Sequence, residues 1–345
     1  MNRPIRIVQY GLGPIGKACV QALLEKSRTG LVEIVGAIDI HPELAGRDLG
    51  EVLGETAAGG VVVSNDARET LRRVRPHVVI HTTSSFLERV YDQIAQCLDA
   101  GASVVSSTEE LFYPLERHPD LAQALDELAR ERGVAVLGTG VNPGFAMDIL
   151  ALTASGICAS IRQIRISRVV DASRRREPLQ RKIGAGISVR EFEERRASGT
   201  FGHIGLQESA SFVARGLGWT IDRFEESLDP VVATERTETD YLTIEEGQVA
   251  GIHQNLVCFR DSHPILELDL QMFTGAPDAH DAVYIDGDPP VDLIIRGGIF
   301  GDTATVAALI NAIPIVVEAA PGLRLALDLP VPRAFATAGG PTPAF

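Results

Sequence analysis

The sequence predicts an α/β protein whose first part is a doubly wound parallel sheet and whose second part is an α+β domain. Up to about residue 150, short apolar segments alternate with segments of helical spacing. Strands that are apolar throughout are buried on both faces, as in a parallel sheet covered by helices. Beyond residue 150, apolar and polar residues alternate, which is typical of strands with one wet face. The 345 residues suit two domains of ordinary size.

Six apolar segments are the expected strands of the first domain, residues 1–147. They are residues 5–10, 32–39, 61–64, 77–83, 102–107 and 134–138. Between them lie helical patterns, among them residues 17–26, an arginine-rich helix before residue 77, and a helix that ends at Gly133. Strand and helix repeated in this order predict the doubly wound sheet.

The second domain, residues 148–333, is predicted to be an α+β domain with an antiparallel or mixed sheet. Residues 161–170 and 264–273 alternate in polarity, and VYIDGDPPVDLII carries a turn between two strands. Residues 302–319 form a helical pattern, and this helix is a candidate to pack back on the first domain. Residues 334–345, rich in Pro, Gly and Ala, are expected to be a loosely ordered tail.

Composition excludes several classes of partner. The net charge of −14 repels phosphate backbones, so we expect no nucleic-acid partner. No uninterrupted apolar stretch is long enough to span a bilayer, so we expect no membrane partner. The four cysteines lie far apart with no CxxC pair or Cys/His cluster, which indicates free thiols, no metal and a cytoplasmic protein. They are Cys19, Cys97, Cys158 and Cys258.

The motif GLGPIG follows the first strand and opens the first helix, in the form GxGxxG. Gly11 permits the tight turn, Gly13 lets the backbone approach a pyrophosphate, and Gly16 lets the helix pack closely on the sheet. Unpaired N–H groups at the helix start favour the phosphates. The motif therefore predicts a Rossmann domain that binds a dinucleotide through Gly11, Leu12, Gly13, Pro14, Ile15 and Gly16.

Asp39 ends the second strand, about 20 residues after the motif, where a carboxylate accepts hydrogen bonds from the adenosine ribose. A carboxylate there repels a 2′-phosphate, so we expect NAD to be preferred. Ile40 follows it and is also expected to contact the cofactor. Arg47 is the nearest basic residue, and it leaves use of NADP, or of both cofactors, open.

Polar segments follow the later strands, where ligands of open α/β sheets bind. We expect the cofactor to meet the segments after the fourth, fifth and sixth strands, although helix capping and a plain hinge are alternative roles for them. Asn142 is a candidate to bind the nicotinamide carboxamide or the substrate, and Gly140 shapes a tight crossing beside it. The candidate cofactor residues in these segments are His81, Thr82, Thr83, Ser84, Thr108 and Asn142.

Glu109 and Glu110 come directly after the fifth strand, where a substrate would meet the nicotinamide. Amine oxidation needs a group that takes a proton from the ammonium and later activates water against the iminium. One carboxylate serves both steps. The alternative is a pair of first-turn helix glutamates favoured by the dipole. Spacing does not distinguish which of the two faces inward.

Two features of the second domain are left with two interpretations each. His203 lies between glycines in FGHIG, either as a structural histidine or as a substrate contact. The basic stretch at residues 173–186, with Arg174, Arg175 and Arg176, is either a lid or a solvated loop.

Several long segments together resemble the 2,4-diaminopentanoate dehydrogenases and related native amine dehydrogenases, within the dihydrodipicolinate-reductase-like superfamily. The resemblance covers about residues 6–333. The segments are GLGPIG, EIVGAIDIHPELAGRDLGEVLG, STEEL, VLGTGVNPGFAMD, GHIGLQES, GLGW, EEGQVAG, GDTATVAALINAIP and LALDLPVP. The arginine run of DASRRREPLQRKIG departs from what we expect of diaminopentanoate dehydrogenases.

The resemblance implies reversible oxidative deamination of an amine, with NAD(P)⁺ and water, to a ketone and ammonia. The family's catalytic glutamate lies in the segment matched by STEEL, and we place Glu109 ahead of Glu110. The resemblance also implies a homodimer formed through the second domain. The expected substrate pocket comprises Phe112, Gly140, Phe145 and His203, with Trp219 a further aromatic candidate.

Three other functions share this architecture. Dihydrodipicolinate reductase itself is disfavoured because its HHxxKxDxPSGT-type motif is missing. Sugar-type dehydrogenases usually carry Glu-Lys-Pro after the fifth strand, and Glu110 stands in place of that lysine. An imine or carbonyl reductase and a non-catalytic dinucleotide sensor stay open as alternatives.

Overall fold

The computed structural model describes residues 3–199 and 201–335 and divides into two compact units. The first unit comprises Met1–Gly144 and Phe300–Phe345, and the second comprises Phe145–Ile299. Most of the predicted tail, residues 336–345, lies outside the described residues. At its start, the Phe335 N–H bonds to Asn311 Oδ1 over 2.8 Å, and Lys26 Nζ donates to the Phe335 carbonyl oxygen over 2.9 Å.

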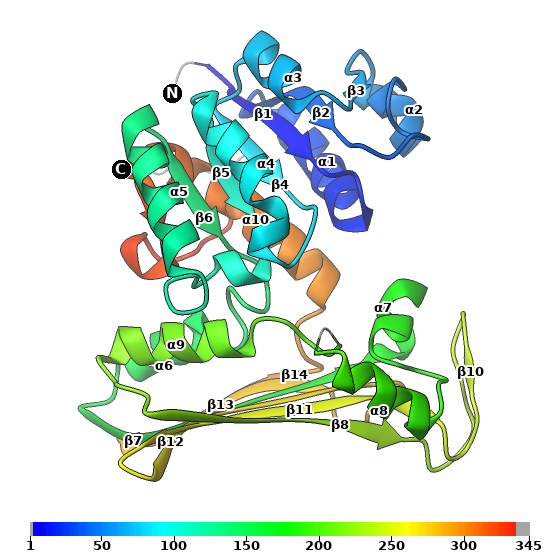
Figure 1. Cartoon of the computed structure of the whole chain (residues 1–345), viewed down its shortest axis with the longest axis vertical. Coiled ribbons are helices and arrows are strands. Elements are labelled where there is room, and N and C mark those ends of the chain that lie inside the picture. The colour runs from blue at the N-terminus through cyan, green and yellow to red at the C-terminus, as the bar shows by residue number, and fades with distance from the viewer. Residues whose placement is uncertain (1–2, 200, 336–345) are drawn as a thin grey trace. The chain divides into compact units, whose positions relative to one another are not determined.

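The first unit is built on a seven-stranded parallel sheet of order β15-β6-β5-β4-β1-β2-β3 (Figure 1). All its strand pairs are parallel, and β4, β5 and β6 are buried along their whole lengths. This is the predicted doubly wound sheet. Its strands are β1 (Ile5–Tyr10), β2 (Val32–Ile38), β3 (Val63–Ser64), β4 (Val78–His81), β5 (Ser103–Ser106), β6 (Ala135–Gly138) and β15 (Gly322–Arg324).

Helices cover both faces of this sheet. On one face, α3 (Ala67–Val74), α4 (Leu87–Asp99) and α5 (Pro119–Arg132) bury Leu71, Ile94 and Leu125. On the other face, α1 (Pro14–Ser27) and α10 (Gly301–Glu318) bury residues such as Leu23 and Ile313. Shorter pieces complete the unit: α2 (Leu49–Leu53), η1 (Thr56–Ala58), η2 (Glu109–Leu111) and η4 (Ala326–Asp328).

The segment from Phe300 onward belongs to the first unit, whereas the sequence analysis drew the second domain to residue 333. The reason is apolar surface on both elements that follow: α10 packs on α1 and β5, and β15 extends the sheet beside β6. Within the described residues, α10 is the one helix long and apolar enough to span a membrane by those two measures. Its buried Leu309, Ile313 and Val316 lie in the core of the first unit, which accounts for its apolarity.

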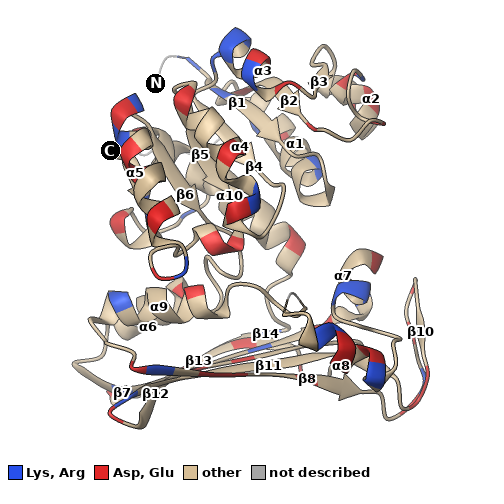
Figure 2. Cartoon of the chain, viewed as in Figure 1, with Lys and Arg blue, Asp and Glu red and all other residues tan. Residues whose placement is uncertain are grey.

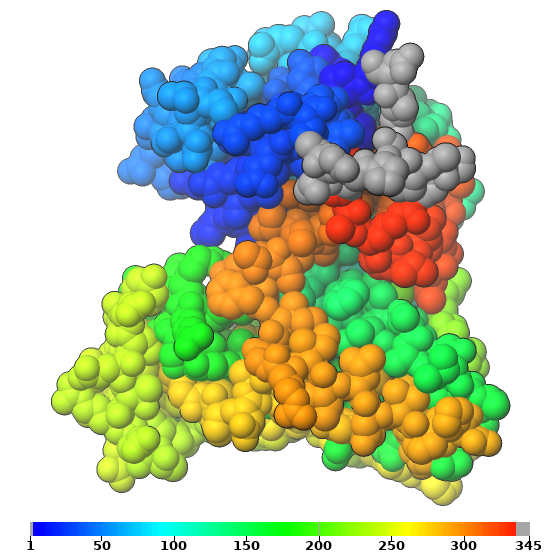
Figure 3. All heavy atoms as spheres, turned by 180° about the vertical axis from the view of Figure 1, so that it is seen from behind, coloured from blue at the N-terminus to red at the C-terminus, as the bar shows by residue number. Residues whose placement is uncertain are grey.

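The second unit carries a six-stranded mixed sheet of order β14-β13-β7-β12-β11-β8. The β12–β7 pair is parallel and the other pairs are antiparallel. The predicted turn in VYIDGDPPVDLII connects β13 to β14, an edge strand whose orange spheres lie at the surface in Figure 3. The strands are β7 (Ser160–Asp171), β8 (Arg223–Val232), β11 (Val249–Arg260), β12 (His263–Phe273), β13 (His280–Asp288) and β14 (Val291–Arg296), with β9 (Thr237–Glu238) and β10 (Thr243–Ile244) as a small separate hairpin.

The helices of the second unit lie on one face of its sheet (Figure 1). They are η3 (Ala172–Arg174), α6 (Ile149–Ser155), α7 (Glu177–Lys182), α8 (Val189–Ala197) and α9 (Leu206–Leu217). Along β12, buried Leu268 and Leu270 alternate with half-buried Asp269 and Gln271, as a sheet with one core face requires. Buried Asp148 joins two of the helices, because it caps Ile149 and accepts from Ser209 Oγ over 2.8 Å.

Candidate functional site

The glycine loop has the geometry of a phosphate cradle. Gly11 has φ +90°, and a Cβ on Gly16 would lie 1.9 Å from the Gly11 carbonyl oxygen, so packing requires both glycines. A Cβ on Gly13 would meet nothing within 4 Å. Gly13 therefore faces open space at the start of α1, where backbone N–H groups and the helix dipole favour an anion. The loop fits the pyrophosphate of a dinucleotide.

Asp39 is joined directly to this loop. Its Oδ2 accepts from the Leu12 N–H over 2.6 Å, and its Oδ1 accepts from the His41 N–H over 2.8 Å. The carboxylate is thus held beside the cradle, at the end of β2. Ile40, next to it, is 78% exposed, which leaves an apolar side chain at the surface beside the carboxylate. Arg47 is also exposed.

The buried side chain of Gln9 holds the glycine loop by hydrogen bonds. Gln9 Nε2 donates to the Gly11 carbonyl oxygen and to Thr82 Oγ1, each over 2.9 Å, and Thr82 Oγ1 donates to the same carbonyl over 3.0 Å. Thr82 thus contributes by holding Gly11. Gln9 was not predicted as a functional residue, although a polar residue inside the apolar strand IRIVQY is unusual.

His81 is fully buried, with its ring inside the first unit. Its Nδ1 lies 2.9 Å from Ser106 Oγ, and its Nε2 lies 2.9 Å from both Gln93 Oε1 and Thr83 Oγ1. Burial lowers the pKa of His81 to about 4, so the ring is neutral at pH 7. The side chain therefore links the segments that follow β4 and β5, a different role from the direct cofactor contact that the sequence predicted.

Thr108 and Ser84 join the same two segments. Thr108 Oγ1 donates to the Ser84 carbonyl oxygen over 2.9 Å, and Ser106 Oγ donates to Thr108 Oγ1 over 2.9 Å. Thr108 is buried, and Ser84 Oγ accepts from the Phe86 N–H over 3.4 Å at the start of α4. These hydroxyls make the segments after β4 and β5 one hydrogen-bonded body.

The two candidate glutamates have different environments. Glu110 is 6% exposed, and its Oε2 accepts from the Leu87 N–H over 2.7 Å and from His118 Nε2 over 2.9 Å. Its own N–H bonds to the Ser85 carbonyl oxygen over 3.2 Å. Glu110 thus caps the first turn of α4 and fixes η2 to it. Sequence reasoning missed His118, whose partner is eight residues earlier in the chain.

Glu109, by contrast, is half-buried at the first position of η2, directly beyond the carboxyl end of β5. The backbone under it is tightly held, because a Cβ on Gly138 would lie 2.5 Å from the Leu111 carbonyl carbon. The end of β6 therefore packs against η2, and the backbone that carries Glu109 is held in place. A partly exposed carboxylate on a fixed backbone is suited to proton transfer.

The segment GTGVNPGF is a compact turn. Gly144 has φ +129°, and a Cβ on it would lie 2.3 Å from the Gly140 nitrogen. The peptide bond between Asn142 and Pro143 is cis, and Asn142 is half-buried. Phe145 is half-buried and begins the second unit. Phe112 is only 1% exposed in the first unit, so its ring belongs to the packed interior.

His203 lies in a loop of the second unit that Gln254 holds on β11. The His203 N–H donates to Gln254 Oε1 over 2.8 Å, and Gln254 Nε2 donates back to the His203 carbonyl oxygen over 3.1 Å. Burial, with smaller contributions from Lys182 and Arg168, lowers the pKa of His203 to about 3. Its Nε2 has no hydrogen-bond partner among the described residues. The ring is therefore neutral at pH 7.

The basic stretch of the second unit is folded rather than extended. It forms η3 and α7, and Gln180 Nε2 donates to the carbonyl oxygens of Ser173, over 3.1 Å, and Arg175, over 2.9 Å. Arg175 is buried, whereas Arg174 is exposed. Across residues 3–199 and 201–335, no group of three or more His, Cys, Asp or Glu side chains has the arrangement of a metal site.

A glycine cradle, an acidic residue at the end of β2 and a carboxylate at the end of β5 define an oxidoreductase that uses a nicotinamide dinucleotide. The family described as 2,4-diaminopentanoate dehydrogenase C-terminal domain matches residues 145–339. The chain is 31% identical over 336 residues to the 2,4-diaminopentanoate dehydrogenase of Acetoanaerobium sticklandii, covering 96% of this chain and 94% of the relative. The chain therefore belongs to the 2,4-diaminopentanoate dehydrogenase family.

Two amine dehydrogenases agree with this assignment. The chain is 26% identical to the amine dehydrogenase of Streptomyces virginiae, covering 97% of this chain and 99% of that one. The solved structure of the amine dehydrogenase from Mycobacterium smegmatis matches with a TM-score of 0.85 and 26% identity, covering 97% of this chain and 98% of that chain. The resemblance seen in the sequence, the fold class and the assignment as an amine-type dehydrogenase are confirmed.

Proposed function

We propose that this protein catalyses the reversible oxidative deamination of an amine to a ketone and ammonia, with Glu109 as the acid/base. The observation that carries this proposal is the difference between the paired glutamates. The Glu110 side chain is buried, and its carboxylate accepts from the Leu87 N–H and from His118, whereas the Glu109 side chain is only half-buried beyond the end of β5 and is thus accessible from outside. Glu110 is proposed to position η2, and Glu109 to meet the substrate.

The dinucleotide is proposed to bind along Gly11–Gly16, with its pyrophosphate at Gly13 and its adenosine ribose at Asp39. Because both Asp39 oxygens already accept backbone N–H groups, the carboxylate is fixed, and a 2′-phosphate there meets a fixed negative charge. We therefore propose NAD as the preferred cofactor and NADP as a weaker one that exposed Arg47 helps to hold. Ile40, Thr82, Ser84, Thr108 and Asn142 stay predictions for the remaining contacts. When bound, the nicotinamide accepts the hydride that leaves the substrate carbon.

The catalytic role proposed for the protein's own side chains is proton transfer. Glu109 takes a proton from the substrate ammonium, which leaves the nitrogen lone pair free to form a C=N bond. Glu109 releases that proton to solvent and, again as a carboxylate, takes a proton from water while the hydroxide adds to the C=N carbon. It then returns this proton to the nitrogen, and the C–N bond breaks to give the ketone and ammonium. In balance, a protonated amine, NAD(P)⁺ and water give a ketone, ammonium, NAD(P)H and one proton. A single carboxylate serves both steps because the two protons leave from neighbouring positions.

The substrate is proposed to be a small amine, either a 2,4-diaminopentanoate-like diamino acid or a simple alkyl amine. The two names come from the relatives in Acetoanaerobium sticklandii and Streptomyces virginiae. Gly140, Phe145 and His203 stay predictions for the substrate pocket, whereas the burial of Phe112 suits a supporting role. The neutral ring of His203 would not repel an ammonium group.

We also propose a cytoplasmic homodimer. The helices of the second unit cover one face of its sheet, and the other face carries polar side chains such as exposed Arg165 and half-buried Asp269 and His253. A partner copy is the proposed cover for that face. The cysteines of the described residues are all free thiols, and three of the four are buried, which suits a reducing compartment.

The first experiment is NADH oxidation with a panel of small ketones, with and without ammonium at alkaline pH, repeated with NADPH. Consumption that requires ammonium supports the proposal, and the ratio of the two cofactors gives the preference. Consumption that ignores ammonium would identify an imine or carbonyl reductase instead. No NADH consumption with any ketone, together with no NADH formation from NAD⁺ and a diamino acid, would point to a protein that binds dinucleotides without turnover.

A further inference from the structure

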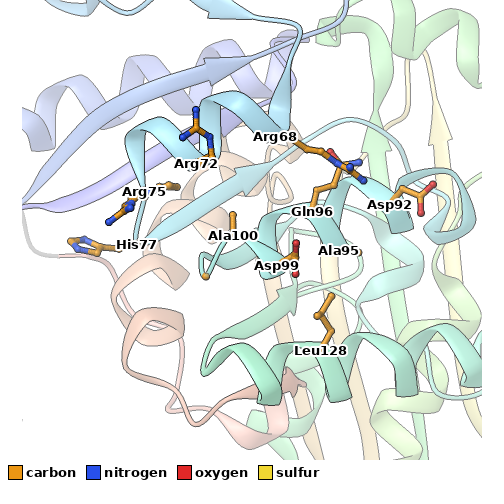
Figure 4. Close-up of a pocket in the computed structure, with 12 residues that line it drawn as sticks. Arg68, Arg72, Arg75, His77, Asp92, Ala95, Gln96, Asp99, Ala100 and Leu128 are labelled. Carbon is orange, nitrogen blue, oxygen red and sulfur yellow. The ribbon is translucent and has the colours of Figure 1, made fainter.

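The first unit contains a groove on the outer side of its helices. It has a volume of about 970 Å³ and runs between α3, α4 and α5. Figure 4 shows Arg68, Arg72 and Arg75 along one side, with His77 at one end. None of the residues that line the groove belongs to the glycine loop or to the segments after β4, β5 and β6. The groove is therefore separate from the candidate dinucleotide site.

The three arginines give the groove a local positive charge. Arg68, Arg72 and Arg75 are exposed, and none lies within ion-pair distance of a carboxylate of the described residues. Figure 2 shows blue, the colour of Lys and Arg, on α3, in a chain whose net charge is −14. Of the two carboxylates that line the groove, Asp99 is already paired with Arg132 over 2.8 Å, and only Asp92 opposes the arginines.

Helix stability explains only one of the three arginines. Arg72 lies in the last turn of α3, where the helix dipole favours a cation, but Arg68 lies in the first turn, where the dipole disfavours one, and the charges of Arg68 and Arg72 repel one turn apart. Arg75 has φ +44°, a left-handed conformation that glycine adopts with less strain. The carbonyl end of α3 already has a cation, because Arg6 Nη2 donates to the Val74 carbonyl oxygen over 2.6 Å. Arg68 and Arg75 thus occupy positions that the helix itself disfavours, which indicates that these two side chains have a role outside the helix.

We infer that this groove is a second anion-binding site, and that it takes an organic polyphosphate of the size of a nucleoside di- or triphosphate. Guanidinium groups bind phosphate oxygens in pairs, and three of them balance the charge of a nucleoside diphosphate and most of the charge of a triphosphate. The volume lies within the range of small-molecule sites and exceeds what phosphates alone need. Ala95, Ala100 and Leu128 supply apolar surface for the organic part.

The test is calorimetric titration of ATP into protein already saturated with NADH, in magnesium-free buffer at low salt. Saturation with NADH keeps ATP out of the glycine cradle. The test variant is Arg68→Gln/Arg72→Gln/Arg75→Gly, and the control is Arg73→Gln, an exposed arginine on the same turn of α3 that does not line the groove. Thermal unfolding of each variant verifies the fold.

We expect the wild type to bind one ATP, the triple variant to bind it at least about tenfold more weakly, and the control to stay within about twofold. Affinity is also expected to fall as salt rises. Absence of ATP binding by the NADH-loaded wild type, or equal binding by the triple variant, would overturn the inference. Pyrophosphate that binds as tightly as ATP would overturn the organic part of it. The inference does not rest on the proposed amine dehydrogenase activity, and the titration does not measure that activity.

Discussion

Two regions of the first unit differ in how their polar side chains are bonded. One comprises the segments beyond the carboxyl ends of β4 and β5, and the other is the groove along α3 and α4. In the first region, His81, Thr108 and Glu110 are buried, and their hydrogen bonds join the chain around the ends of β4 and β5. Glu109, next to Glu110 in η2, is half-buried. Along α3, exposed arginines are held by no carboxylate of the described chain. In the first region the polar side chains are held by hydrogen bonds within the protein. In the second region we propose that a bound anion pairs with the arginines.

The sharpest test of this contrast is Glu109→Gln. We expect a loss of about 100-fold or more in kcat, the scale of general acid–base catalysis, because the amide cannot take the substrate proton. NADH binding, followed by fluorescence, should stay as in the wild type, since Glu109 is not part of the cradle. Turnover near the wild-type rate in this variant would remove Glu109 from the mechanism.

Glu110→Ala should act on stability instead. It leaves the Leu87 N–H and His118 Nε2 without their buried acceptor, and we expect a loss of about 2–3 kcal/mol in the free energy of unfolding. Urea denaturation measures this loss. His118→Ala is the matched variant on the other side of the bond and should lose less, because the Leu87 N–H keeps its partner. Unchanged stability in both variants would contradict the positioning role.

Gly13→Val separates binding from folding in the cradle. Because a Cβ there meets no atom of the chain, we expect the melting temperature to stay nearly unchanged. Affinity for NADH should fall by about tenfold or more, since the side chain fills the space of the pyrophosphate. Gly16→Ala is the control that should affect folding. Its Cβ would clash with the Gly11 carbonyl oxygen, so we expect it to lower the stability of the first unit. Retained NADH affinity in Gly13→Val would argue against pyrophosphate at this position.

Acid should weaken the fold through His81 and His203, because the protein environment lowers the pKa of both histidines. Burial places the pKa of His81 at about 4 and that of His203 at about 3, both below the ordinary value of 6.5. Below that value the unfolded chain binds protons that the folded chain does not. Stability is therefore full above about pH 6.5 and falls toward pH 4, by up to about 1.4 kcal/mol per pH unit for each histidine. Urea midpoints from pH 7 to pH 4.5 measure the slope, and His81→Asn should flatten it.

The smallest expected effect is a gain. Arg75→Gly replaces a strained left-handed arginine, and we expect an increase of about 0.5–1 kcal/mol in the free energy of unfolding. The same change should weaken ATP binding in the groove. A variant that is more stable yet binds less would show that Arg75 is kept for binding. A loss of stability would show that Arg75 serves the fold.

The glycine loop and the strands could be predicted from the sequence because the residue patterns that specify them are local. GLGPIG after an apolar run fixes its own geometry, and each buried strand carries its own apolar pattern. Partners distant in sequence were not predictable in the same way. Gln9 meets Thr82 across the sheet, and His203 meets Gln254, which is 51 residues away. Tertiary packing also decided which of Glu109 and Glu110 is buried, and adjacent positions in the sequence give no indication of that.

The first unit is discontinuous in the chain, and this has a consequence for how the protein is made. Its β1 to β6 leave the ribosome first, but α10 and β15, which cover one face of the sheet and complete its edge, follow only after the whole second unit. Until then, the apolar surface beside Leu23 that α10 will cover is open to solvent. Synthesis thus exposes an unfinished dinucleotide domain for the time needed to translate about 155 residues, ~10–30 s at ordinary rates. Chaperone demand is expected to be highest in that interval.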